Sequence, residues 1–248
     1  MADVTKTVGG TTPDYATWTL FIAAIPADIS AATGTGEHWI GKGRDALFSE
    51  NFVVSPVTDT TNRVTLTYDT GAQHDGRARA VSGSGCSIEG TNTAGTVRPT
   101  CQHITIDGLD IFTNAAGTVI PLNLASYAAG ANETIIKNCI LHANTTSASQ
   151  YMIPASRTNL VLDMYNNIGY SGRRVTDTRN AAAVTISYCT FWIHANQLGL
   201  VSDTELTCTN TYVGQSTGSA QCFWTGGASP SGSNNISSDA TANIDYTS

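Results

Sequence analysis

Charged side chains are scarce in this sequence and make up only 12% of it, about half of the share usual in soluble proteins. Twelve lysines and arginines stand against 19 aspartates and glutamates, which leaves a net charge of −7. The basic residues do not cluster beyond Arg77 with Arg79 and Arg173 with Arg174. Because a nucleic-acid groove needs a basic stripe, we expect no nucleic-acid partner. The hydrophobic share of 41% is ordinary, so the low charge does not indicate disorder.

Long apolar runs are also missing. None approaches the ~20 residues that a membrane-spanning helix needs, so we expect no membrane partner. The opening MADVTKTVGG has neither the basic start nor the apolar stretch of a secretory signal. We therefore expect a soluble protein that is made in a cytoplasm.

The spacings that mark common metal sites and phosphate-binding loops are absent as well. The six cysteines form no C-x-x-C pair, and the five histidines show neither H-x-H nor H-x₃-H. The Gly-rich stretch SGSGCS at 82–87 lacks the lysine of a phosphate-binding loop. We expect no catalytic, cofactor-binding or metal-binding residues, and no cofactor.

What the sequence does contain is a repeated strand pattern with a two-residue skip. Residues 184–194, VTISYCTFWIH, alternate apolar and polar through Ile186, skip Ser187 and Tyr188, and resume at Cys189. One strand does not skip, but two short strands joined by a bend keep both apolar sets facing one interior. The same skip occurs in ITIDGLDI (104–111), TIIKNCIL (134–141), LVLDMYNNI (160–168) and LTCTNTYV (206–213). Repeats at steps of 30, 26, 24 and 22 residues, counted from position 109, indicate stacked coils.

The bend and the stacked columns follow from this pattern. One bend residue needs a positive φ, which Gly and Asn tolerate best, and Gly108, Asn138 and Asn210 hold that place; Met164 and Tyr188 depart from it. We expect one inward column of Ile106, Ile136, Leu162, Ile186 and Cys208. We expect the next column to contain Leu109, Cys139, Tyr165, Cys189 and Thr211, and a third to contain Ile111, Leu141, Phe191 and Val213, with Asn167 as a misfit.

These coils resemble the right-handed parallel β-helix of the pectate-lyase-like superfamily, in which a strand–bend–strand unit recurs in each turn. The resemblance covers about residues 60–225. It implies an all-β chain, folded as a single-stranded right-handed parallel β-helix with an N-terminal capping α-helix.

The two ends of the chain differ from the repeat. Residues 14–25 place Trp18, Phe21, Ile22 and Ile25 on one helical face, with Asp14 as the expected N-cap. We expect this helix to cover the open end of the solenoid, whose strand edges and core are otherwise exposed. The predicted division is 1–60 for the cap and lead-in strands, 61–225 for the β-helix, and 226–248 for an extended Gly/Ser/Asn-rich tail.

Two cysteines of the repeat, Cys139 and Cys189, fall on inward positions, where a small buried hydrophobe is expected. Without a secretion signal we expect the cysteines to be free thiols rather than disulfides. Cys86 and Cys101 flank a loop and are the pair that later oxidation can join.

Several short motifs resemble structural proteins of tailed bacteriophages. They are TVGG…DYATWTLFIAAIPADI…EHWIG, ITIDGLDIF and SGSNNISSDATA. This resemblance implies a non-enzymatic virion protein, made in the host bacterial cytoplasm, that forms a homotrimer and binds the major capsid protein as a capsid decoration (cement) protein. The alternative is a tail-associated β-helix protein that binds a receptor or depolymerises a polysaccharide, with a surface glycan as its partner.

The coils offer few groups for chemistry. Asp107 and Asp110 are the nearest carboxylate pair, as a glycosidase would require. We expect Asp107, Lys137 and Asp163 to stack as an exposed charge ladder rather than to form an acid–base pair. The aromatic residues Trp192, Phe223 and Trp224 are candidates for a contact with a glycan or a protein. We favour a protein, because interface cores are rich in aromatic and poor in charged residues.

Overall fold

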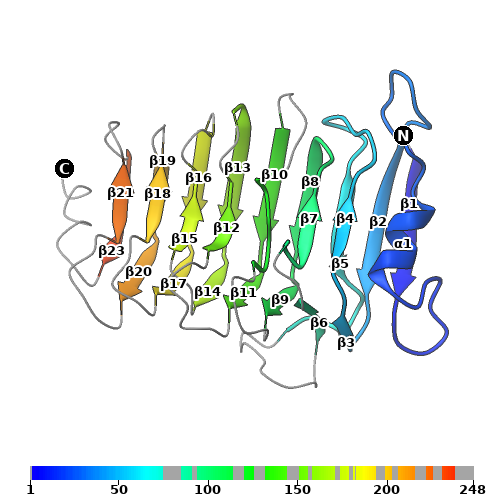
Figure 1. The fold of residues 1–248 in the computed structure, drawn as a ribbon, viewed down its shortest axis with the longest axis horizontal. Coiled ribbons are helices and arrows are strands. Elements are labelled where there is room, and N and C mark those ends of the chain that lie inside the picture. The colour runs from blue at the N-terminus through cyan, green and yellow to red at the C-terminus, as the bar shows by residue number, and fades with distance from the viewer. Residues whose placement is uncertain are drawn as a thin grey trace.

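The computed structural model forms a right-handed parallel β-helix, as the repeat predicts. It describes residues 2–74, 85–90, 94–113, 120–125, 132–143, 151–155, 158–170, 174–178, 181, 183–193, 199–202, 206–215, 222–225 and 231–237. Every pairing between its named strands is parallel, and each strand pairs with the equivalent strand of the neighbouring coil. The coils stack along the long axis, with α1, β1 and β2 at one end and β21 and β23 at the other (Figure 1).

Two long sheets carry most of the coils. The first sheet has nine strands in the order β1 (Ala2–Val8), β2 (Glu37–Gly43), β5 (Val64–Tyr68), β8 (His103–Asp107), β10 (Asn132–Lys137), β13 (Leu160–Tyr165), β16 (Ala183–Ser187), β19 (Leu206–Thr209) and β22 (Ser231–Ser233). The second sheet has eight strands in the order β23 (Ile236–Ser237), β20 (Tyr212–Gln215), β17 (Thr190–Ile193), β14 (Ile168–Tyr170), β11 (Ile140–Ala143), β9 (Asp110–Thr113), β6 (Cys86–Gly90) and β3 (Ala46–Ser49).

Shorter sheets complete the coils. The third sheet joins β12 (Tyr151–Pro154), β15 (Arg174–Asp177), β18 (Leu200–Ser202) and β21 (Phe223–Thr225). Near the N-terminal end, β4 (Phe52–Val54) pairs with β7 (Val97–Pro99). The hydrophobic core runs through the interior that these sheets enclose.

The bend between the first and second sheets takes a left-handed backbone in coil after coil, as the skip predicts. Its positive-φ residues are Gly108 (70°), Asn138 (54°), Asn166 (52°), Tyr188 (54°), Asn210 (51°) and Asn234 (59°). Gly and Asn adopt this conformation most readily, so Tyr188 is the exception among them.

The third repeat differs from the predicted columns by two residues. Met164, not Leu162, pairs with Ile136 and Ile186, and Leu162 pairs with Thr134 and Val184. The predicted inward place of Tyr165 is therefore wrong, because its side chain is 51% exposed. Asn167 takes that place beside Cys139 and is 1% exposed. The residue that we predicted would not fit the columns is therefore an inward-facing member of the second one.

Helix α1 (Trp18–Ala24) caps the N-terminal end of the solenoid (Figure 1). Its Trp18 and Phe21 are fully buried, and the Trp18 ring stacks on Phe52. The predicted N-cap is wrong, since Thr17 is the residue whose side chain accepts from the Leu20 amide at the start of the helix.

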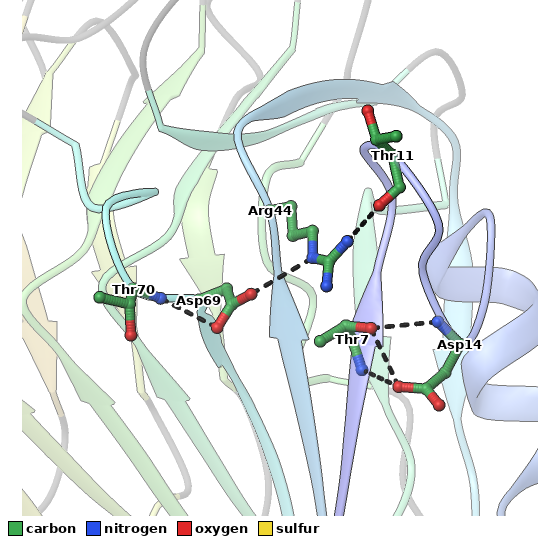
Figure 2. Close-up of polar contacts among 6 residues, drawn as sticks. All are labelled: Thr7, Thr11, Asp14, Arg44, Asp69 and Thr70. Atoms are coloured by element: carbon green, nitrogen blue, oxygen red, sulfur yellow. Dashed lines mark hydrogen bonds and ion pairs between the residues drawn. The ribbon is translucent and has the colours of Figure 1, made fainter.

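Asp14 instead fastens the loop before the helix to β1. Its carboxylate accepts hydrogen bonds from the backbone N–H and the hydroxyl of Thr7, at 2.7 and 2.9 Å (Figure 2). These bonds lower the pKa of Asp14 below its usual value. Arg44 donates to the Thr11 carbonyl and lies 3.3 Å from Asp69, which ties the same loop to the second coil (Figure 2).

Candidate functional site

The outward face of the first sheet brings charged residues from three coils together. Arg63, just before β5, places Nη2 2.9 Å from Oε2 of Glu133 on β10. His103 on β8, the strand between them, has Nδ1 3.7 Å from the same oxygen. Glu133 is therefore held by a cation from a neighbouring coil, in a charge-assisted contact.

Asp163 lies one strand further along, on β13. It points outward, because the residues on either side of it, Leu162 and Met164, are buried in the core. In register it neighbours Ile135 on one side and Thr185 on the other. Glu133 sits two residues before Ile135 on the same face, so strand geometry puts the Cα atoms of Glu133 and Asp163 about 8 Å apart.

The pKa of Asp163 is raised above the usual value of an aspartate. The main cause is loss of hydration on partial burial, and the nearby negative charge of Glu133 adds to it. A hydrogen bond with Thr185 opposes the shift. A carboxyl group with a raised pKa thus lies near another that is paired with an arginine, and such arrangements are found at acid–base sites.

The predicted charge ladder is confirmed only in part. Lys137 and Asp107 are in register, with 3.3 Å between Nζ and Oδ2. The residue that continues their row is Tyr165, because the third repeat is shifted by two residues and Asp163 pairs with Ile135.

The structure also separates the predicted pair Asp107 and Asp110. Asp107 faces outward on the first sheet, whereas Asp110 belongs to β9 of the second sheet and is fully buried. There it lies 4.0 Å from Nε2 of the buried His142, and it contributes to a raised pKa of about 12 for Tyr170. Asp107 and Asp110 therefore cannot act on one bond.

The aromatic residues singled out in the sequence do not form one platform. Trp192 is 42% exposed on the outward face of β17, as its place after the buried Phe191 predicts. Phe223 is buried, and the side chain of Trp224 lies outside the described part of the chain, as do Arg77, Arg79 and Arg173. Tyr165 and Tyr188 are exposed aromatics that the sequence pattern did not identify, because Tyr165 was assigned to the core and Tyr188 to a bend.

A hollow beside the cap lies between α1 and β4 and has a volume of about 490 Å³. Its lining includes Ile22, Ile25 and Phe52 and contains no titratable side chain, so it offers no group for acid–base chemistry. Within the described ranges no three His, Cys, Asp or Glu side chains meet as metal ligands would. No helix of the described residues has the length and apolarity to cross a bilayer.

Sequence reasoning placed Asp163 in a charge ladder and did not connect it with Glu133 or Arg63. Arg63 and Glu133 are 70 positions apart in the sequence, and Glu133 and Asp163 are 30 apart. Only the stacking of coils with unequal loops makes them neighbours. The available signal was the alternation of side chains along each strand, which places these residues on the outward face.

Comparison with known proteins supports the fold. No family model matches the chain, and no curated protein matches it. Among solved structures, a pectin methylesterase from Aspergillus niger, crystallised in a penultimately deglycosylated form, aligns with a TM-score of 0.55 and 12% identity over 97% of this chain and 88% of its own. Pectin methylesterase from carrot aligns with a TM-score of 0.53 and 12% identity over 98% and 85%. At this identity the likeness defines the class of fold, a parallel β-helix.

The same comparison corrects the predicted function. Both neighbours are enzymes named for a polysaccharide, and neither is a capsid or virion protein. The prediction of a non-enzymatic capsid decoration protein is therefore contradicted, and the polysaccharide-active alternative agrees better with these neighbours. The prediction took the lack of a local catalytic motif as the lack of a site, and a local motif cannot report residues such as Glu133 and Asp163, which are neighbours only across coils.

Proposed function

We propose that this chain is a polysaccharide-depolymerising hydrolase whose active site is the outward face of the first sheet around Asp163 and Glu133. The observation that carries the proposal is the raised pKa of Asp163 beside a Glu133 that is paired with Arg63. Hydrolysis of a glycosidic bond requires one carboxylic acid and one carboxylate on the same face.

Each group has a defined step in this reaction. Asp163 donates its proton to the glycosidic oxygen as the bond to the anomeric carbon breaks. Glu133 accepts a proton from the water that attacks that carbon, and its negative charge stabilises the positive charge that develops on the sugar ring. Arg63 and His103 hold the Glu133 carboxylate in place, at 2.9 and 3.7 Å.

Hydrolysis of a sugar ester is the second candidate reaction. It is favoured by the likeness to two pectin methylesterases, and the same acid and carboxylate can serve it. The two reactions release different products, since glycosidic cleavage creates a reducing end and ester cleavage releases an alcohol or an acid.

The setting of the activity is part of the proposal. The phage-like motifs favour a tail-associated protein of a virion, with a bacterial surface glycan as substrate. Homotrimer formation would present three such faces to the glycan, as closed symmetric assemblies do.

The test compares the wild-type chain with Asp163→Asn and Glu133→Gln on pectin, polygalacturonate and extracted bacterial surface polysaccharides. We expect reducing ends to be released by the wild-type chain, and the rate to fall at least about 100-fold in either variant. Lys42→Gln, an outward change on β2, four strands from Asp163 in the same sheet, serves as a control and should keep full activity. Methanol and acetate release are measured in the same samples, and equal product release by the wild-type chain and Asp163→Asn would contradict the proposal.

A further inference from the structure

The bend residue Tyr188 stands in a conformation that costs stability. Its φ is 54°, and the equivalent residues of the neighbouring coils, Asn166 and Asn210, have φ of 52° and 51°. A bulky side chain is unfavourable in this left-handed region, whereas asparagine tolerates it. Strain of this kind persists where the side chain serves another purpose, so the question is what the tyrosine ring does.

Packing does not account for the ring. Tyr188 is 55% exposed, and its contact is with Tyr165, itself 51% exposed, at 5.4 Å between ring centroids and an interplanar angle of 66°. The two rings stand at the corner where the first sheet turns into the second. Asn166 and Asn210 precede and follow Tyr188 in the stack of bends.

A second pair of rings lies on the adjoining face of the second sheet. Trp192 is 42% exposed and stacks on Tyr212, with 6.3 Å between centroids and 25° between planes. Its ring lies over Gly214, where an added Cβ would stand 2.4 Å from the ring carbons. The missing side chain at Gly214 therefore lets the indole lie against β20 with part of its surface open to solvent.

The two pairs form one strip. Tyr188, Thr190 and Trp192 are alternate residues that point outward, so the strip from Tyr188 to Trp192 extends over about 13 Å. It is continuous with the proposed active site, because Tyr165 is two residues from Asp163 on the same face of β13. Its described neighbours Ser187, Thr190 and Thr209 bear hydroxyl groups, and the charged Lys137 borders it only at Tyr165.

We propose that Tyr165, Tyr188, Trp192 and Tyr212 bind consecutive sugar rings of the polysaccharide that is processed at Asp163, so that the substrate chain passes around the corner between the two sheets. The inference rests on the proposed function for its ligand class. Flat aromatic rings with hydroxyl-bearing neighbours suit the apolar face and hydroxyl rim of a sugar. The long strip selects a polymer over a short oligosaccharide, and its uncharged surroundings beyond Lys137 select sugar units without charge at that end.

A matched set of variants tests the strip by binding alone, in the inactive Asp163→Asn background. Tyr188→Asn installs the residue that neighbouring coils carry, so it should fold at least as well as its parent, and Trp192→Ala removes the second pair. Leu47→Ala is the control, since Leu47 is 37% exposed on the outward face of β3, coils away from the strip. Affinity electrophoresis in gels with pectin, polygalacturonate, xylan, galactomannan or an extracted bacterial surface polysaccharide gives the dissociation constant for each variant.

We expect at least one polymer to retard the parent and Leu47→Ala equally, and to bind about tenfold more weakly to Tyr188→Asn and to Trp192→Ala. Oligosaccharides too short to reach the strip should not distinguish the variants. Retardation by none of the polymers, or equal retardation of all variants, would overturn the inference. A fall in molar mass by light scattering in Tyr188→Asn would also overturn it, because the strip would then be a subunit interface.

Failure of this inference and failure of the proposed function give different results. If the four rings do not bind the polysaccharide, product release still requires Asp163, and Tyr188→Asn leaves the dissociation constant unchanged. If the hydrolase is wrong, no product is released while strip-dependent binding remains.

Discussion

The side-chain oxygen of Asn167 accepts a hydrogen bond of 2.9 Å from the backbone N–H of Cys139 in the preceding coil. The amide nitrogen of Asn167 donates to the Ile136 carbonyl at 2.8 Å, so one buried side chain pairs with two backbone groups at the bend of the coil before it. Asn235 repeats this arrangement with the Thr211 amide and the Cys208 carbonyl, at 3.0 and 2.7 Å. These amides hold successive bends together from inside the solenoid.

Replacing Asn167 by alanine should lower the free energy of unfolding by about 2–5 kcal/mol, because both backbone groups stay buried when their partner is removed. Urea denaturation followed by circular dichroism measures the change. Asn235→Ala is the control at the last described coil, where less structure is stacked on the bend, and it should cost less. Equal midpoints for Asn167→Ala and the wild-type chain would show that the pairing contributes nothing.

Replacing Thr185 by valine should move the alkaline limit of activity to higher pH. The Thr185 hydrogen bond lowers the pKa of Asp163, so its loss raises that pKa further. The proposed acid works only when protonated, and activity falls as the pH rises through its pKa. A profile of kcat/KM against pH measures the limit, and a Thr185→Ser variant, which keeps the hydroxyl, should retain the wild-type profile. A shift to lower pH in Thr185→Val contradicts the assignment.

Replacing Asp163 by asparagine should also stabilise the fold near neutral pH. A raised carboxyl pKa means that the folded state binds the proton more tightly than the unfolded chain, so stability falls as the pH rises above the usual value of about 3.9. Asparagine has no charge to desolvate, which removes this cost. The melting temperature at pH 7 minus that at pH 3 should be more positive in Asp163→Asn than in the wild-type chain, because carboxylates with a lowered pKa, such as Asp14, still gain stability over this range. A less positive difference would argue against the raised pKa.

Replacing Glu50 by alanine should destabilise the N-terminal cap by about 1–2 kcal/mol. Its carboxylate accepts hydrogen bonds from the backbone N–H groups of Trp18 and Thr19, at 2.8 and 2.9 Å, and so satisfies the first donors of α1. Thermal unfolding monitored by tryptophan fluorescence reports on the cap through the buried Trp18. Glu50→Gln, which keeps an acceptor oxygen, should lose less stability than Glu50→Ala.

Replacing Tyr188 by asparagine should raise the free energy of unfolding by about 1 kcal/mol, because asparagine accepts the left-handed backbone at lower cost. The reverse change, Asn210→Tyr at the next bend, should lower stability by a similar amount. Urea midpoints of the two variants measure both effects. A destabilised Tyr188→Asn would mean that the ring contributes to folding, and the strain argument would then fail.

The sequence defined the coil of this protein through local rules. Side chains alternate along a strand, and two strands joined by a left-handed residue must skip two positions, so Ile106, Cys139 and Cys189 were placed inside from their spacing alone. The amphipathic pattern of Trp18 and Phe21 likewise predicted the cap, since a helical face that is apolar must be buried.

Only the tertiary structure decided the register of the third repeat and the position of the site. The spacing LVLDMYNNI allows two alignments, and the buried pairing of Asn167 with Cys139 selects the one that turns Tyr165 outward and sets Asp163 beside Ile135. Arg63, Glu133 and Asp163 belong to different coils, and the loops between those coils differ in length. Their meeting depends on how whole coils stack, a long-range property that hydrophobic alternation within a single strand does not encode.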